Sequence, residues 1–304
     1  MGALPMDVSD RDDMRGVAPR ENGAPRDAKS APLLEVENLS VEFTRDDFTL
    51  LALDRVSLNV NEGEFVCVVG ASGCGKTTLL KTIDGLLKPT EGSVRVRGHV
   101  ASSAQGDMAM VFQDDALLPW RTILANVRLG LDLRSRRSKE FDKLAHDALK
   151  LVNLKHFDNH YPHELSGGMR QRVNLARALV VDPEVLLMDE PFAALDAQTR
   201  EVMQTELLDI WNRAKKTVVF ITHQLDEAVL LADRVIVMGA HPGRIRAEVP
   251  IDIPRPRDLR TKRDPKFVQY VDLIWGLIEE EVRRSVLDDI TKFDDESDDP
   301  ARDD

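Results

Sequence analysis

The chain has 304 residues, of which 42% are apolar and 31% charged, a composition typical of a globular protein with a large core. The net charge is −12, but the last 17 residues hold nine acidic and two basic side chains, so the rest is nearly neutral and gives no electrostatic case for binding nucleic acid. We expect no membrane span and no secretory signal peptide, and the two cysteines, Cys67 and Cys74, suit a reducing compartment rather than a disulfide framework.

Residues 1–32 are rich in Asp, Arg, Pro, Gly and Ala and show little periodicity, so we expect them to be disordered. From Leu34 onward, short apolar runs alternate with helical patterns, which predicts an α/β fold with crossover helices. Five runs are rich in β-forming residues and mostly continuous, which indicates strands buried on both faces. They are EFVCVVG, MAMVFQ, VLLMDE, TVVFITH and RVIVMG.

The first motif is a glycine-rich phosphate loop, Gly70–Thr77 (GASGCGKT), which follows the run EFVCVVG and precedes an expected helix. Backbone N–H groups at this helix start are expected to bind phosphate, and Gly73 and Gly75 let the backbone come close. Lys76 is predicted to neutralise the β- and γ-phosphate oxygens, and the Thr77 hydroxyl to bind Mg²⁺. Other loop residues expected at the nucleotide are Gly70, Ser72, Cys74 and Thr78, with Cys74 acting as a small filler.

Between residues 114 and 180 the pattern changes to helical spacing, as in SKEFDKLAHDALKLVNL, with no strong strand signal. We interpret this region as a helical subdomain inserted into the α/β core. Within it, the segment Leu117–Val127 (LLPWRTILANV) follows closely on Gln113. Trp120 in this segment is either an exposed anchor for a partner or part of a local helical core.

A second phosphate-binding turn is predicted in the segment Leu165–Arg172 (LSGGMRQR), because a serine and two glycines stand before an expected helix. Ser166, Gly167 and Gly168 can donate hydrogen bonds to an anion, but they supply neither a base nor a metal ligand. A simpler interpretation makes Ser166 the N-cap of the following helix, although this leaves the paired glycines unexplained.

The run Val185–Glu190 (VLLMDE) ends in two carboxylates at the tip of an expected buried strand. Asp189 is predicted to be a hard oxygen ligand for Mg²⁺, mostly through water. Glu190 is predicted to polarise the attacking water as a general base. Such a strand end is weak evidence alone, but together with the phosphate loop it predicts nucleotide hydrolysis.

Beyond Asp264, apolar residues recur at helical spacing, which predicts an amphipathic helix over residues 265–287. We expect this helix to pack on its own domain, with a partner-binding face as the alternative. The acidic residues 288–304 are expected to form a disordered tail. The apolar stripe consists of Phe267, Tyr270, Val271, Ile274, Leu277 and Ile278.

The motifs GASGCGKTT, LSGGMRQR, LLMDEP, ALDAQTR and FITHQLDEA stand in the order found in the ATP-binding-cassette (ABC) ATPases, which the chain resembles over about residues 34–243. The resemblance implies an α/β P-loop NTPase of the ABC-ATPase fold, here spanning residues 33–264. Such a fold has a RecA-like core, an N-terminal antiparallel β subdomain and an inserted α-helical subdomain.

The resemblance also implies a head-to-tail homodimer, in which each ATP lies between the phosphate loop of one subunit and the turn Ser166–Gly168 of the other. Gln113 resembles the glutamine that reaches Mg²⁺ and the attacking water, and Asp196 the residue that crosses the dimer interface. His223 resembles the histidine that hydrogen-bonds the γ-phosphate. Phe43 stands where the family usually has a tyrosine stacked on adenine, with plain strand core as the alternative.

These implied roles make the chain the ATP- and Mg²⁺-dependent subunit of a transporter, peripheral on the cytoplasmic face of the inner membrane. It would drive a transmembrane permease through contacts near Leu117–Val127 and work with a periplasmic binding protein. The motifs resemble importers of nitrate, sulfonates or taurine. One alternative is a soluble cassette ATPase of DNA repair or translation, which would carry coiled coils, zinc modules or a second cassette. The other is a small-molecule kinase, which would need neither the Ser166 turn nor His223.

Overall fold

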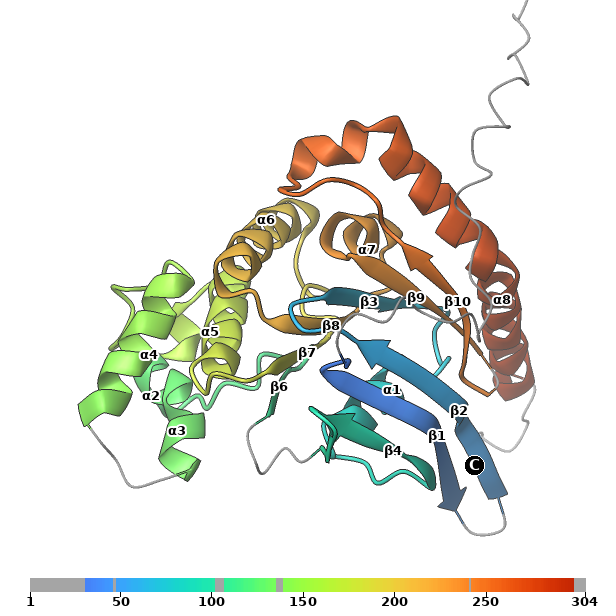
Figure 1. The fold of residues 1–304 in the computed structure, drawn as a ribbon, viewed down its shortest axis with the longest axis horizontal. Helices are drawn as coiled ribbons and strands as arrows, with labels where there is room; N and C mark the ends of the chain where they lie inside the picture. Colours follow the sequence, from blue (N-terminus) through green and yellow to red (C-terminus); the bar gives the residue numbers. More distant parts are fainter. Residues whose placement is uncertain (1–30, 46–47, 102–106, 135–138, 241, 298–304) are drawn as a thin grey trace, which may run out of the picture.

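The computed structural model describes residues 31–45, 48–101, 107–134, 139–240 and 242–297. The segment 1–32, expected to be disordered, lies outside the described residues apart from its last two. Two β-sheets form the body, and a group of helices lies beyond one edge of the larger sheet (Figure 1). Within the described ranges, no helix combines the length and the apolar character that crossing a membrane requires.

The larger sheet has six strands in the order β10–β9–β3–β8–β7–β6, and all neighbours are parallel except β10 and β9. Every residue of β3, β7 and β8 is buried, as expected for strands covered on both faces. The carboxyl ends of these strands meet at one edge, where the predicted catalytic segments follow. The bounds are β3 Phe65–Val69, β6 Met108–Val111, β7 Val185–Asp189, β8 Thr217–Ile221, β9 Arg234–Gly239 and β10 Arg244–Pro250.

The smaller sheet is antiparallel, with the strand order β2–β1–β4–β5. Its inward side chains share one core cluster with the helix α1 (Lys76–Ile83) and with one face of the larger sheet. The helix α1, which directly follows the phosphate loop in sequence, is therefore packed between the two sheets. The bounds are β1 Leu34–Arg45, β2 Phe48–Val60, β4 Glu91–Val96 and β5 His99–Val100.

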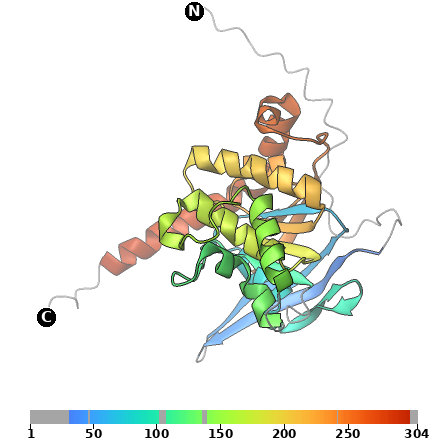
Figure 2. The ribbon, with the colours of Figure 1, turned by 90° about the vertical axis from the view of Figure 1, so that its left-hand side faces the viewer.

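The remaining helices cover the other face and the edges of the larger sheet (Figure 1). Four of them form the group beside β6, and the C-terminal part of α8 projects away from the body (Figure 2). The group consists of α2 Ile123–Val127, α3 Leu129–Arg134, α4 Lys139–Leu151 and α5 Gly167–Leu179. The others are η3 Pro162–Glu164, α6 Ala197–Ala214, α7 Leu225–Leu231, η4 Leu259–Arg263 and α8 Pro265–Ser297.

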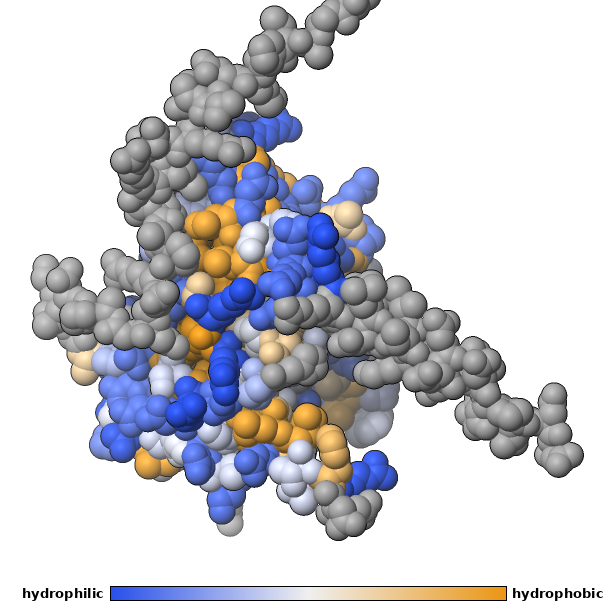
Figure 3. Space-filling model, turned by 90° about the vertical axis from the view of Figure 1, so that its right-hand side faces the viewer, coloured by the Kyte–Doolittle hydropathy of each residue, from blue (hydrophilic) through white to orange (hydrophobic). Residues whose placement is uncertain are grey.

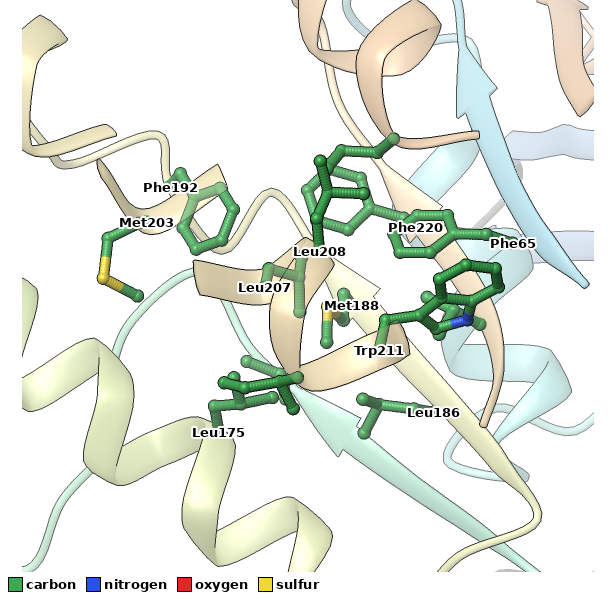
Figure 4. Close-up of a cluster of buried hydrophobic side chains, with 14 of the residues drawn as sticks. Phe65, Leu175, Leu186, Met188, Phe192, Met203, Leu207, Leu208, Trp211 and Phe220 are labelled. Atoms are coloured by element: carbon green, nitrogen blue, oxygen red, sulfur yellow. The ribbon is translucent and has the colours of Figure 1, made fainter. Parts of the chain in front are cut away.

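Aromatic side chains fix α6 against the larger sheet (Figure 4). The ring of Trp211 on α6 meets Phe65 of β3 edge-on, with centroids 5.9 Å apart, and Phe65 in turn lies 5.9 Å from Phe220 of β8. All three side chains are buried, and each such aromatic contributes about 1.5–3 kcal/mol to stability. Because the indole N–H of Trp211 also donates to the Lys216 carbonyl (2.8 Å), the helix is held at a defined depth.

The fold class predicted from the sequence is confirmed, whereas some predicted element ends are wrong. The strand β6 ends at Val111, two residues before Gln113. The strand β7 ends at Asp189, because Glu190 adopts a left-handed φ of 45° that a strand cannot accommodate.

The C-terminal helix α8 begins at Pro265, with Asp264 accepting a hydrogen bond from the Lys266 N–H (2.8 Å). It packs on its own domain as expected, through a stripe of buried residues. The helix runs to Ser297, so the predicted boundary at 288 is wrong; apolar residues continue at helical spacing at 286, 290 and 293. The buried stripe consists of Phe267, Tyr270, Ile274 and Ile278.

Asp84, at the C-terminal end of α1, is 6% exposed, and this burial raises its pKa to about 6. Because the folded-state pKa lies above the unfolded value, the folded chain is favoured most below pH about 4 and loses that stability as the pH rises through about 6. We expect Asp84→Asn to raise the free energy of unfolding at pH 8 by about 1–3 kcal/mol, with a gain that shrinks towards pH 5. Urea unfolding of both proteins at the two pH values measures this, and an equal gain at both would contradict it.

Candidate active site

A cavity of about 570 Å³ opens at the carboxyl edge of the larger sheet. It is formed by the phosphate loop, by the start of α1 and by the segments that follow β7 and β8. The sequence-predicted residues that line it come from three separate parts of the chain, which only the parallel sheet brings together. They are Ser72, Gly73, Gly75, Lys76, Thr77, Thr78, Glu190 and His223.

The phosphate loop is shaped by close contact with β2. Gly75 has a φ of 93°, and a Cβ atom there would lie 2.8 Å from Leu53 Cδ2 and 3.1 Å from the Ala52 carbonyl oxygen. Only glycine fits both this conformation and this space. The loop therefore delivers the free N–H groups of the first turn of α1 to the cavity.

Lys76 currently stabilises the loop that it belongs to. Its ammonium donates to the carbonyl oxygens of Gly70 (2.9 Å) and Ala71 (3.0 Å). Cys74 lies behind the loop, where burial raises the pKa of its thiol although the charge of Lys76 opposes this. A protonated, buried thiol is consistent with the filler role expected for Cys74.

Thr77 and Asp189 form an oxygen pair beneath the phosphate loop. The Thr77 hydroxyl donates to Asp189 Oδ1 at 3.1 Å, and Asp189 is 6% exposed. Burial raises the pKa of Asp189, and the hydrogen bond from Thr77 partly opposes this. A hydroxyl and a carboxylate next to a phosphate site are the hard oxygen donors that Mg²⁺ prefers, so these residues fit the metal.

Glu190 and His223 lie next to each other in the cavity lining. The distance between His223 Nδ1 and Glu190 Oε2 is 3.0 Å, and the Glu190 N–H donates to the Ile221 carbonyl (3.1 Å). The histidine side chain is 55% exposed and the glutamate side chain 22%. The left-handed backbone of Glu190 turns its carboxyl group out of the strand, a strained conformation of the kind that functional sites retain.

The second predicted turn does not line this cavity. Ser166 is the N-cap of α5, and its hydroxyl accepts from the Met169 N–H at 3.3 Å. Close packing explains why position 168 is a glycine, because a Cβ atom there would lie 2.9 Å from Thr199 Cγ2. Gly167 is exposed and has more space. The capping interpretation of Ser166 therefore holds locally, and packing accounts for one of the two glycines.

Asp196, Gln113 and Phe43 also lie outside the cavity lining, as do Gly70, Cys74 and Asp189 behind and beneath the phosphate loop. Asp196 is exposed and caps α6 by accepting from the N–H groups of Gln198 (3.1 Å) and Thr199 (3.0 Å). Its pKa is lowered, chiefly by a hydrogen bond with the Thr199 side chain. Gln113 is an exposed residue beyond the end of β6.

Phe43 is 41% exposed on β1, so the strand-core alternative for this residue is wrong. Its cross-strand neighbour Leu50 and the nearby Phe48 are exposed as well. Hydrophobic side chains gather in patches on the face that includes this hairpin and α8 (Figure 3). An exposed phenyl ring on this hairpin is available for stacking on a planar ligand.

Sequence reasoning missed the arginines of α5 that hold the segment after Gln113. Arg170 Nε donates to Asp115 Oδ2 (2.8 Å), while Arg177 donates to the carbonyl oxygens of Asp115 and Ala116 (both 2.8 Å). The helix that begins at the Ser166 turn is thus tied to the loop leading to Trp120. No local pattern signals these contacts, because their partners lie more than 50 residues apart in sequence.

A phosphate loop between the buried strand β3 and the helix α1, with carboxylates at the carboxyl end of β7 in the same sheet, defines a P-loop nucleotide hydrolase. The chain matches the family described as ABC transporter over residues 53–193. It is 49% identical over 253 residues to an uncharacterized ABC transporter ATP-binding protein, MJ0412, of Methanocaldococcus jannaschii, covering 83% of this chain and 94% of that protein.

Two relatives with assigned transport roles are equally similar to the chain. It is 44% identical to the nitrate import ATP-binding protein NrtD of Synechocystis sp., covering 81% of this chain and 94% of that protein. It is also 44% identical to the taurine import ATP-binding protein TauB of Rhizobium johnstonii, covering 81% and 96%.

Among solved structures, the chain resembles the dimeric post-hydrolysis state of the cassette MJ0796 bound to ADP and Pi. The TM-score is 0.64 at 34% identity, covering 73% of this chain and all of that one. The chain therefore belongs to the ABC transporter family, as an ATP-binding subunit that hydrolyses ATP.

Proposed function

We propose that two copies of the chain associate head to tail on ATP and hydrolyse it to drive a membrane permease. The observation that carries this is the separation of the two phosphate-binding turns. The phosphate loop, Glu190 and His223 share one cavity, while the Ser166 turn, in which Ser166 and Gly167 are exposed, does not line it. A turn that is built to bind an anion but is absent from its own chain's cavity is free to complete the cavity of a second copy. The relative solved as a dimer bound to ADP and Pi supports the association of two copies.

Within each site, Lys76 exchanges the carbonyls of Gly70 and Ala71 for phosphate oxygens of ATP. Glu190 accepts a proton from the attacking water, and the His223 side chain, held beside Glu190, donates a hydrogen bond to the γ-phosphate. Thr77 and Asp189 would hold Mg²⁺. When bound, Mg²⁺ supplies positive charge that offsets the negative charge developing on the phosphates.

The remaining predicted residues complete the proposal. Phe43 would stack on adenine, Gln113 would contribute to holding the metal and to orienting the attacking water, and Asp196 would lie at the contact between the two copies. The contribution of Ser166 comes from the opposite subunit, together with Gly167 and Gly168.

The segment Leu117–Val127 is the proposed contact with the permease on the cytoplasmic face of the membrane. Trp120 is 72% exposed, so the alternative of a local helical core is wrong for this side chain. Leu117, Ile123 and Val127 are buried and anchor the segment to the helical group. A large exposed aromatic on a firmly anchored segment is typical of an interface anchor.

We further propose that the transporter imports a small anion such as nitrate, a sulfonate or taurine, delivered by a periplasmic binding protein. The names of the relatives support this class. The nitrate and taurine relatives are equally identical to the chain, so identity to these relatives does not distinguish between the two substrates.

Trp120→Ala is expected to lower uptake of the transported anion by cells at least about tenfold, because removal of an interface anchor costs roughly 2 kcal/mol or more. ATP hydrolysis by the purified chain should stay within about twofold of the native rate, because Trp120 lies outside the cavity. Uptake of labelled nitrate, taurine and an alkanesulfonate measures this in cells whose only copy carries the change. Leu133→Ala removes another exposed side chain of the helical group (80% exposed) and serves as the control. Native uptake with Trp120→Ala would contradict the proposed contact.

A further inference from the structure

A buried polar network outside the cavity holds the segment that carries His223. Thr222 directly precedes His223 and is 2% exposed. Its N–H donates to the Val68 carbonyl of β3 (3.2 Å), and its hydroxyl donates to Glu227 Oε2. The same hydroxyl accepts from the Gln224 N–H at 3.0 Å. Both the backbone and the side chain of Thr222 are thus fixed.

Glu227 joins three elements of the fold. It lies in the first turn of α7, is 3% exposed, and accepts from Gln204 Nε2 of α6 through its other oxygen (3.0 Å). Gln204 is 1% exposed. A carboxylate in the interior is costly unless its oxygens are hydrogen-bonded, and here each oxygen has its own donor. The network therefore connects the end of β8 to α7 and to α6.

We infer that Glu227 is a positioning residue for ATP hydrolysis: it fixes Thr222, and through Thr222 it holds His223 at hydrogen-bond distance from Glu190. Gln204 extends this constraint to α6, the helix that Asp196 caps. Through α6 and the hydrogen bonds from Gln204 to Glu227 and from Thr222 to Glu227, the network connects the proposed dimer contact with His223 and Glu190. The inference rests on the proposed roles of His223 and Glu190.

Thr222→Val tests the network, because valine keeps the shape of threonine and removes only the hydroxyl. We expect kcat for ATP hydrolysis to fall about tenfold, since small misplacements at a reacting centre are costly. KM for ATP should stay within about twofold, because the phosphate loop is unchanged. Thr222→Ser keeps the hydroxyl and should restore the native kcat. A purely structural role would not separate kcat from KM in this way.

Thr217→Val is the matched control. Thr217 stands at the other end of β8, is 1% exposed, and accepts from the Gly63 N–H at 2.9 Å. Its substitution also removes a buried hydroxyl, so a similar fall in Tm is expected, with native kcat and KM. If Thr217→Val lowers kcat as much as Thr222→Val does, loss of stability explains both and the inference is wrong.

Glu227 itself is tested by a pair of variants. In Glu227→Gln, the new amide oxygen can accept from Thr222 and the new amide nitrogen can donate to Gln204 Oε1, which has no hydrogen-bond partner among the described atoms, after that side chain flips. We expect Glu227→Gln to keep most of the native kcat and Glu227→Ala to lose about as much as Thr222→Val.

His223→Ala separates failure of the inference from failure of the proposed function. If His223→Ala hydrolyses ATP at the native rate, the proposed role of His223 is wrong. If His223→Ala is inactive while Thr222→Val and Glu227→Ala keep the native kcat, the role of His223 stands and the positioning role of Glu227 is wrong.

Discussion

Glu190→Gln is expected to lower kcat for ATP hydrolysis at least about a hundredfold, because positioned general bases contribute 10²–10⁴-fold to such reactions. Glutamine has the shape of glutamate and can still contact His223, but it cannot accept a proton from water. Binding of ATP should be unchanged, so the variant should accumulate as an ATP-bound dimer. Steady-state phosphate release and size-exclusion chromatography with ATP or ADP measure the two effects.

The control for this variant is Glu184→Gln. Glu184 immediately precedes β7, and it pairs with Arg97 (2.8 Å) away from the cavity. It should keep native hydrolysis and form no long-lived dimer. If Glu190→Gln hydrolyses ATP at the native rate, Glu190 is not the general base.

Ser166→Arg is expected to abolish hydrolysis by the native assembly while leaving ATP binding to the single chain intact. The arginine fills the exposed turn and removes the hydroxyl that we propose faces the neighbour's γ-phosphate. Loss of the helix cap costs about 1 kcal/mol, too little to unfold a domain of this size. Equilibrium binding of a fluorescent ATP analogue and phosphate release together test the expectation.

Thr122→Ala isolates the capping effect. Thr122 caps α2 by accepting from the Ala125 N–H at 3.3 Å, the same distance as the cap that Ser166 makes. It should lower Tm by a similar amount and leave hydrolysis by the purified chain unchanged. If Ser166→Arg weakens ATP binding to the isolated chain, the turn belongs to its own cavity and the proposed division between copies fails.

Motif spacing predicted the fold class and the residues of the cavity lining, because the chemistry there depends on local sequence. Gly70–Thr77 needs its glycines for the backbone path, and Glu190 follows a strand that reads as continuous apolar sequence. The buried stripe of α8 was predictable for the same reason, since helical periodicity reports which face is covered.

Long-range polar contacts were not predictable. Glu227 stands in an ordinary amphipathic helix pattern, and Gln204 reaches it across 23 positions of sequence, so neither shows a local signal. The end of β7 was also missed, because the left-handed φ of Glu190 is imposed by the tertiary fold and not by a glycine. Packing of Gly168 against Thr199 likewise depends on how α5 meets α6.

We propose that each ATP site is formed by two copies of the chain, and mixing two inactive variants tests this most directly. Lys76→Ala disables the phosphate loop and Ser166→Arg disables the opposing turn, so neither pure variant should hydrolyse ATP. In an equal mixture half of the dimers are mixed, and each mixed dimer holds one site with both parts intact, so about a quarter of the native activity should return. A mixture no more active than the pure variants would contradict the account.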